Sequence, residues 1–163
     1  MPDSDHVDTV LAQWSAAQPD LDVRTMGVLG RLARLERVAA AAQSRTFARH
    51  GIDPASFDVL ATLRRADVEA LTPAALARSS MITTGAVTQR LDRLERAGWV
   101  TRQPHGTDGR SVEVALTTSG RAVVDAVLPD HLNTQDHVLE ALDQTDRDHL
   151  AGLLRRLLHA HDA

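Results

Sequence analysis

The chain has 163 residues, 43% of them apolar, and a formal net charge of −4 at pH 7. This length and composition suffice for one hydrophobic core and favour a single compact unit. There is no run of about 18 apolar residues and no basic-then-apolar start, so we expect neither a transmembrane helix nor a signal peptide, and a cytoplasmic protein. Cysteine is absent, which excludes disulfides, thiol redox switches and thiolate metal sites.

Charge is distributed unevenly along the chain. Residues 1–22 contain five acids and no basic residue, whereas residues 23–49 contain six arginines and one glutamate. Residues 78–122 contain seven arginines and four acids, and the segment from 123 onward contains eight acids and three arginines. Positive charge is therefore concentrated in two segments, although the whole chain is acidic.

The apolar spacing predicts three helices in the first third of the chain. The first carries an apolar stripe over residues 7–14 and ends before Pro19. The second runs from near Val23 to about His50, where Gly51 stops it. The third opens at Asp53-Pro54, because an aspartate N-cap followed by proline is a typical helix start.

A helix-turn-helix follows. Thr72-Pro73 repeats the capping pattern and predicts a short helix from about Pro73 to Ser79. Met81-Ile82 then forms the turn, and Thr83 or Thr84 caps a second helix that ends at Gly98.

The remaining segments predict a β-hairpin and two further helices. Residues 99–103 and 111–116 alternate in polarity and read as strands joined by a turn over residues 104–109. Helices are expected over about 118–133 and 145–161. The predicted fold class is mainly α with a small β-hairpin wing (α+β), a winged helix-turn-helix.

The second helix of the helix-turn-helix has the features of a DNA-reading element. Its N-terminal end would approach base edges and phosphates, which favours the small or hydrogen-bonding side chains found there. On a helical wheel the outward residues lie opposite an inward stripe of Val87, Leu91 and Leu94. The candidate DNA-contacting residues of this helix are Thr83, Thr84, Thr88, Gln89 and Arg93.

The hairpin tip supplies a further candidate. Arg110 is a planar cation suited to the narrow minor groove, and Asp108 lies two residues before it, where it would support the arm. The alternative is that Arg93 and Arg96 are ordinary solvated charges and that Asp108-Gly109 is an ordinary turn.

Two motifs carry a resemblance to a known family. Asp108-Gly109-Arg110 followed by Leu116-Thr117-Thr118-Ser119-Gly120 resembles the wing signature of the MarR family of winged helix-turn-helix regulators, and residues 94–100 match the segment before it. The likeness spans roughly residues 28–158. It implies double-stranded DNA as partner and a homodimer, with residues 1–52 and 118–163 forming a helical dimerisation region and residues 53–117 the DNA-binding lobe.

The first helix and the third point to a subgroup. Trp14, residues 19–22 and residues 57–60 are similar to the PecS-type, urate-responsive and aconitate-responsive TamR-type regulators. That resemblance implies an anionic ligand, urate or a tricarboxylate such as citrate or aconitate. The ligand-binding positions that match are Trp14, Asp58, Arg90 and Arg102.

The residues themselves give partial support to that site. Arg90 lies on the flank of the inward stripe, so its guanidinium should face the protein and seek a carboxylate, for which Asp58 is a candidate. The alternative is that Asp58 and Arg90 form a structural ion pair and that Trp14 only packs.

These observations predict a ligand-responsive repressor that needs no cofactor. Two alternatives remain: a constitutive DNA-binding regulator without a ligand, and a metal-responsive regulator, since the chain has eight histidines. Their spacing lacks the i, i+4 geometry of a helical metal site. An enzyme is disfavoured, because nucleophile elbows, phosphate loops and dinucleotide fingerprints are missing.

Overall fold

The computed structural model describes residues 4–80, 84–105 and 111–161, without the side chains of Thr84, Ala86, His105 and Ser111. The chain divides into two compact units, residues 1–42 and residues 43–163. The second helix contains the point of division. Within the described residues, no helix is both long enough and apolar enough to cross a bilayer.

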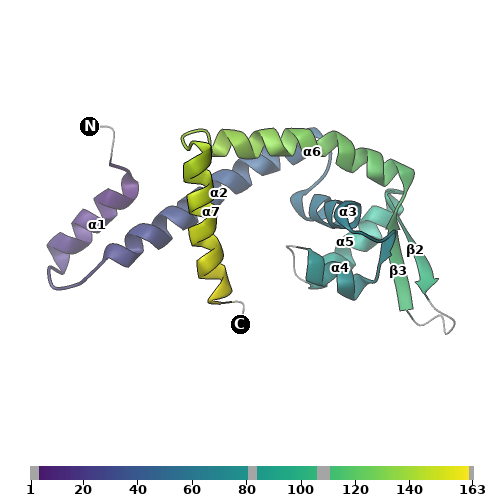
Figure 1. Cartoon of the computed structure of the whole chain (residues 1–163), viewed down its shortest axis with the longest axis horizontal. Coiled ribbons are helices and arrows are strands. Elements are labelled where there is room, and N and C mark those ends of the chain that lie inside the picture. Colours follow the sequence, from purple (N-terminus) through teal and green to yellow (C-terminus); the bar gives the residue numbers. More distant parts are fainter. Residues whose placement is uncertain (1–3, 81–83, 106–110, 162–163) are drawn as a thin grey trace. The chain divides into compact units, whose positions relative to one another are not determined.

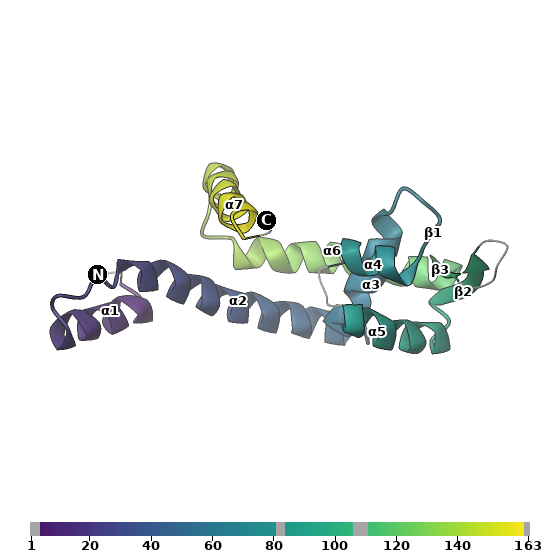
Figure 2. The same ribbon diagram turned by 90° about the horizontal axis from the view of Figure 1, so that it is seen from below.

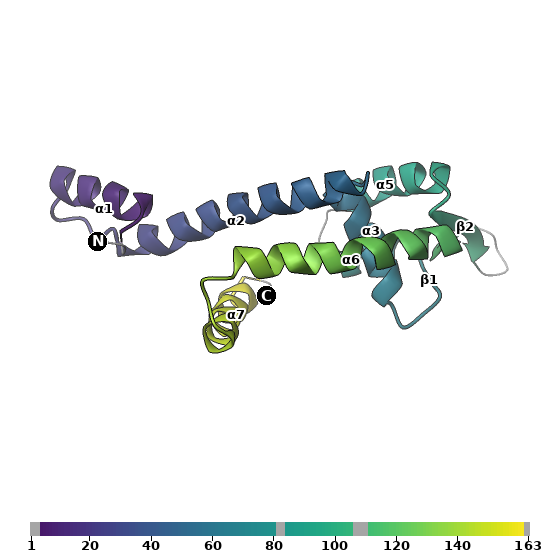
Figure 3. The same ribbon diagram turned by 90° about the horizontal axis from the view of Figure 1, so that it is seen from above.

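The unit of residues 1–42 pairs two helices, α1 (His6–Ala17) and the first part of α2 (Arg24–Arg49), which lie side by side (Figures 2 and 3). Asp5 caps α1 by accepting hydrogen bonds from the first turn, and the Asp8 side chain accepts one from the Asp5 backbone N–H. Arg31 of α2 meets both carboxylates, at 3.0 Å from Asp5 and 2.6 Å from Asp8. Ion pairs thus join α2 to the capped end of α1.

The unit of residues 43–163 gathers three helices beside a small sheet (Figure 1). Its elements after α2 are α3 (Pro54–Arg65), β1 (Ala70–Leu71), α4 (Pro73–Ser79), α5 (Thr84–Arg96), β2 (Val100–His105), β3 (Ser111–Leu116), α6 (Thr118–Val138) and α7 (Gln144–His159). The core joins α3, α4, α5, the sheet and the first half of α6. Its fully buried members include Leu60, Leu76, Leu94, Val114 and Val124.

The sheet has the order β1-β3-β2 and is antiparallel throughout. Strand β1 is a two-residue bridge, Ala70 facing Ala115 and Leu71 facing Val114, and the sequence pattern did not predict it. Pro104 was predicted to lie in the hairpin turn, but it is part of β2, where it faces Val112. Because β2 is an edge strand, a residue without an N–H is tolerated there.

The sequence predictions of helices and fold class are confirmed in most particulars. Asp53 caps α3 and Thr72 caps α4, each with proline at the start of the helix. The largest difference is in α6, which was expected to end near Asn133 and continues to Val138. Its last turns, Thr134 to Val138, are mostly polar, so apolar periodicity gave no signal there.

Candidate nucleic-acid interface and ligand site

Helix α5 presents a polar face to solvent because its apolar stripe is buried. Val87, Leu91 and Leu94 are each at most 2% exposed, as the helical wheel predicted. Thr88, Gln89 and Arg93 lie on the exposed side. Helix α4 packs against α5 and its capping residue Thr72 accepts a hydrogen bond from the Ala75 N–H. The outward polar residues of α5 are therefore exposed to solvent.

Several predicted DNA-contacting positions lie outside the described residues. These are Thr83 before α5 and both Asp108 and Arg110 in the hairpin, while Thr84 is described only as a helical residue. The strands that lead to the hairpin tip, β2 and β3, are described and pair along their whole length. The DNA contacts of Thr83, Thr84, Asp108 and Arg110 therefore remain predictions.

The segment Leu116 to Gly120 joins the hairpin to α6 and to the end of α5. Thr117 caps α6 and also donates a hydrogen bond to the Gly98 carbonyl at 2.7 Å, and Ser119 donates to the same carbonyl at 2.8 Å. A Cβ on Gly120 would come within 1.9 Å of the Trp99 carbonyl oxygen. Only glycine fits this close approach, which explains the motif physically.

The guanidinium groups of Arg90 and Arg93 share one carboxylate, that of Asp53. The distances are 3.5 Å from Arg90 Nε and 3.3 Å from Arg93 Nη1 to the Asp53 oxygens. Asp58 was the carboxylate predicted from the sequence to pair with Arg90. In the structure Arg90 pairs with Asp53. Asp53 directly precedes α3 and faces this side of α5, whereas Asp58 lies in the second turn of the helix.

Asp53 combines this pairing with its capping role. It accepts hydrogen bonds from the Ser56 backbone N–H at 3.0 Å and from the Ser56 hydroxyl at 2.7 Å. Burial opposes the charged form, but the Ser56 hydrogen bonds and the charges of Arg90 and Arg93 outweigh it and lower the pKa of the Asp53 carboxyl. The sequence showed only the N-cap. The spacing of Arg90 and Arg93, one turn apart on α5, was the sequence feature that could have indicated a shared carboxylate.

Arg102 connects the hairpin to the opposite side of α5. It donates a hydrogen bond to Asp92 at 2.5 Å and lies 3.5 Å from a Glu95 oxygen. Its side chain is 29% exposed, close to the 27% of Arg90. Both predicted ligand-binding arginines are therefore half-buried and face carboxylates of the protein, as the wheel argument required for Arg90.

The Nε atoms of Arg90 and Arg102 are buried and make no hydrogen bond among the described residues. Arg90 Nε lies 3.5 Å from Asp53 Oδ1, which brings the two charges together but does not meet hydrogen-bond geometry. A buried N–H without an acceptor is costly. Each of these arginines therefore has an Nε donor that forms no hydrogen bond with a described residue.

The other two predicted ligand residues lie in different units of the molecule. Trp14 is on α1 and is 41% exposed within the unit of residues 1–42. Asp58 is on α3, is half-buried, and lines a groove of about 720 Å³ formed by the end of α2, by α3 and by α6. The groove also receives Arg64 and Arg65.

His131 lies in the wall of the same groove, a position that no sequence pattern predicted. Its ring stacks on Phe47 with centroids 5.1 Å apart and tilts against Phe57 at 5.3 Å. Burial lowers the pKa of this imidazole. Its Nδ1 is buried without a hydrogen bond in the described part of the chain. The described residues contain no cluster of three metal-ligating side chains.

Comparisons with known proteins agree on one family. The model of the MarR family matches residues 50–111. The chain is 36% identical to the HTH-type transcriptional regulator PecS of Dickeya dadantii over 152 residues, 93% of this chain and 92% of PecS.

Solved structures are similar over most of the chain as well. A mutant of MarR from E. coli complexed with operator DNA superposes with a TM-score of 0.72 at 27% identity, covering 89% of this chain and 97% of that one. Bordetella bronchiseptica BpsR, described with a mechanism for regulation of its DNA binding by 6-hydroxynicotinic acid, has a TM-score of 0.72 at 25% identity, with 80% and 98% covered.

Proposed function

Because the chain belongs to the MarR family of DNA-binding transcriptional regulators, we propose that it binds a pseudo-palindromic operator as a homodimer, represses transcription there, and is released by a small anionic ligand. The observation that carries the DNA-binding part is the outward polar face of α5 beside the β2–β3 hairpin. A helix of this kind reads the major groove while a neighbouring arm follows the backbone.

Gln89 is the residue proposed to read base edges. Its amide matches the donor and acceptor pattern of adenine, so Gln89→Ala should cost about 1–3 kcal/mol on the operator and far less on random duplex. Fluorescence anisotropy measures both affinities, with intergenic DNA beside the gene as the operator and a random duplex for comparison. Gln13→Ala, exposed on α1, is the matched control. Equal losses on both duplexes would contradict base reading by Gln89.

The homodimer is supported by apolar surface that the single chain leaves exposed. Helix α7 has no buried residue, and Leu153, Leu157 and Leu158 are 42%, 49% and 60% exposed. Exposed leucines in a row at helical spacing are typical of an interface.

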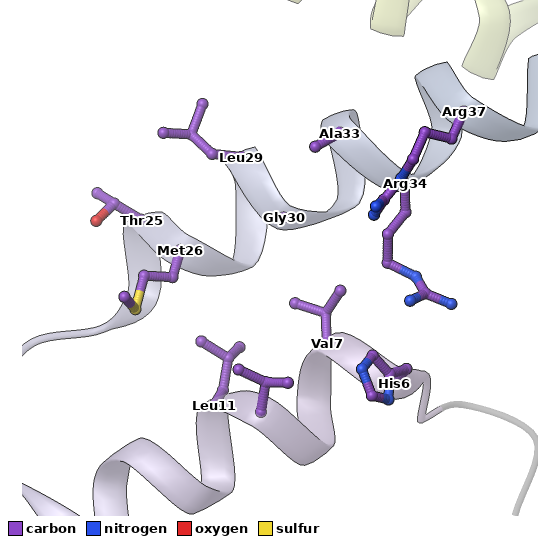
Figure 4. Close-up of a pocket in the computed structure, with 11 residues that line it drawn as sticks. His6, Val7, Leu11, Thr25, Met26, Leu29, Gly30, Ala33, Arg34 and Arg37 are labelled. Carbon is purple, nitrogen blue, oxygen red and sulfur yellow. The ribbon is translucent and has the colours of Figure 1, made fainter. Parts of the chain in front are cut away.

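The unit of residues 1–42 has a complementary surface. A groove of about 450 Å³ between α1 and α2 is lined by apolar side chains such as Leu11 and Leu29, with His6, Arg34 and Arg37 gathered at one end (Figure 4). Acids cluster at the start of α7, at Asp143, Asp146 and Asp148. We propose that these apolar surfaces meet across two copies of the chain.

Light scattering tests the dimer. The wild type should have twice the mass of one chain, and Leu157→Asp should halve it, because a charge placed in an apolar interface must be desolvated. Arg155→Asp, on the opposite side of α7, is the control. A wild-type mass of one chain at micromolar concentration would contradict the homodimer.

The ligand is proposed to act through Arg90 or Arg102, and the family resemblance adds Asp58 and Trp14 as further candidate residues. An anion that reaches Arg90 or Arg102 would compete with Asp53 or Asp92 for its guanidinium. Arg90 belongs to α5, and Arg102 of β2 contacts α5 through Asp92. Movement of either arginine would therefore change the separation of the two α5 helices in a dimer. Operator half-sites have a fixed spacing, and such a change costs affinity.

Titration of urate, citrate and aconitate into the protein bound to its operator tests the ligand. One of them should release DNA from the wild type, and Arg90→Ala and Arg102→Ala should weaken that response while leaving the dimer intact. Trp14→Phe should respond more weakly if the indole contacts the ligand, with Trp99 as the remaining fluorophore. If no anion releases DNA, a constitutive regulator or one that responds to metal is favoured instead.

A further inference from the structure

Asp53 lies at the junction between the N-terminus of α3 and the DNA-facing side of α5. Its side chain is only 27% exposed, and it already accepts two hydrogen bonds from Ser56. The carboxylate is therefore held in place by its own helix. It does not need the arginines of α5 to stay oriented.

The two arginines differ in how freely they can leave. Arg90 is 27% exposed, whereas Arg93 is 60% exposed and extends from the outward face of α5. An ion pair with an exposed partner contributes little to stability and exchanges readily with other anions. A phosphate group of a duplex at this face is such an anion, and the duplex has a high density of negative charge.

We propose that Asp53 competes with DNA phosphate for Arg93, so that an acid of the protein reduces the affinity of its own DNA-binding helix. The inference rests on the proposed role of α5 in DNA binding. In the free protein Asp53 neutralises Arg93, and on DNA the guanidinium must leave that carboxylate before it gains a phosphate. Asp53 then keeps its partners Arg90 and Ser56, so its negative charge stays compensated.

The variant Asp53→Asn separates the two roles of this residue. Asparagine caps helices as well as aspartate, so α3 should keep its start, while the charge that holds Arg93 is gone. We expect about two- to fivefold tighter binding to duplex at low salt for each released arginine, the worth of one exposed ion pair. The slope of log K against log salt should stay that of the wild type, because Arg93 meets a phosphate in both proteins once it has left Asp53.

Asp67→Asn is the control for the loss of one negative charge. Asp67 follows α3 in the same unit of the chain, is exposed, and forms no ion pair among the described residues. Thermal unfolding of Asp53→Asn monitors the cap of α3. The double variant Asp53→Asn with Arg93→Ala should lose the gain in affinity.

The outcomes distinguish this inference from the proposed function. If Arg93→Ala weakens DNA binding but Asp53→Asn behaves like Asp67→Asn, or binds more weakly than the wild type, the competition is refuted and α5 keeps its role. If neither Arg93→Ala nor Gln89→Ala changes DNA binding, the proposed DNA-binding face of α5 is itself wrong. Tighter binding that requires Arg93, with an unchanged salt slope, supports the competition.

Discussion

The lobe from α3 to β3 and the last helix α7 use leucine in opposite ways. In the lobe, Leu60, Leu76 and Leu94 are fully buried by their own chain. In α7 no residue is buried, although its leucines recur at the same helical spacing. The same pattern thus indicates an internal core in one region and a surface that needs a partner in the other. Exposure in the folded chain, and not the pattern, separates the two.

The largest effect should come from truncating a leucine in the lobe. Leu60→Ala removes a fully buried side chain and should lower the free energy of unfolding by about 2–5 kcal/mol. Leu157→Ala should act through dimerisation, so its cost should depend on protein concentration. Urea unfolding at two concentrations about tenfold apart measures both. A concentration-independent loss of equal size in the two variants would break the contrast.

Gly120→Ala tests whether the lobe is as tightly built at its edge as in its centre. The added methyl would clash with the Trp99 carbonyl, a backbone group that cannot rotate away. We expect a loss of about 1–3 kcal/mol, the usual cost of overpacking. Gly152→Ala, in α7 with open space around it, is the control and should be neutral or stabilising. Denaturant unfolding gives both values.

The smallest effect concerns the pH dependence of stability. It comes from His131, in the groove formed by the end of α2, by α3 and by α6. Burial lowers the pKa of His131 in the folded chain below its value in the unfolded chain. Above the unfolded value both states are neutral and stability is at its full level. As pH falls below it, the unfolded chain takes up the proton first and stability is lost.

His131→Phe should remove this acid sensitivity, because phenylalanine preserves the stacking on Phe47 without a titratable group. Thermal unfolding across a pH series from neutral to mildly acidic measures it. His149→Phe, exposed on α7, should keep the wild-type dependence. An acid sensitivity unchanged in the His131 variant would assign it to other groups.

Local rules predicted the framework of this fold well. Asp53-Pro54 and Thr72-Pro73 mark helix starts because capping depends on adjacent residues alone. The inward stripe of α5 was also predicted from local spacing. Strand β1 was not, since two residues carry no period and their pairing with Ala115 and Val114 is made across the fold.

The ion pairs around α5 could be predicted only in kind. The wheel showed that Arg90 would face the protein and would need a carboxylate. Asp53 and Asp58 are five residues apart on the same segment, and the choice between them depends on how α3 and α5 cross. The groove histidine had no sequence signal, because its contacts with Phe47 and Phe57 join three separate helices.

The junction at Gly120 makes α6 a mechanical lever. Thr117 and Ser119 attach the start of this helix to the Gly98 carbonyl, so the hairpin root and the first turn of α6 move together. With 21 residues, α6 is about 31 Å long. A tilt of about 5° at the root corresponds to about 3 Å of travel at the far end. A sideways displacement where α6 meets α7 would therefore rotate the hairpin root if α6 moved as a rigid rod through Pro129.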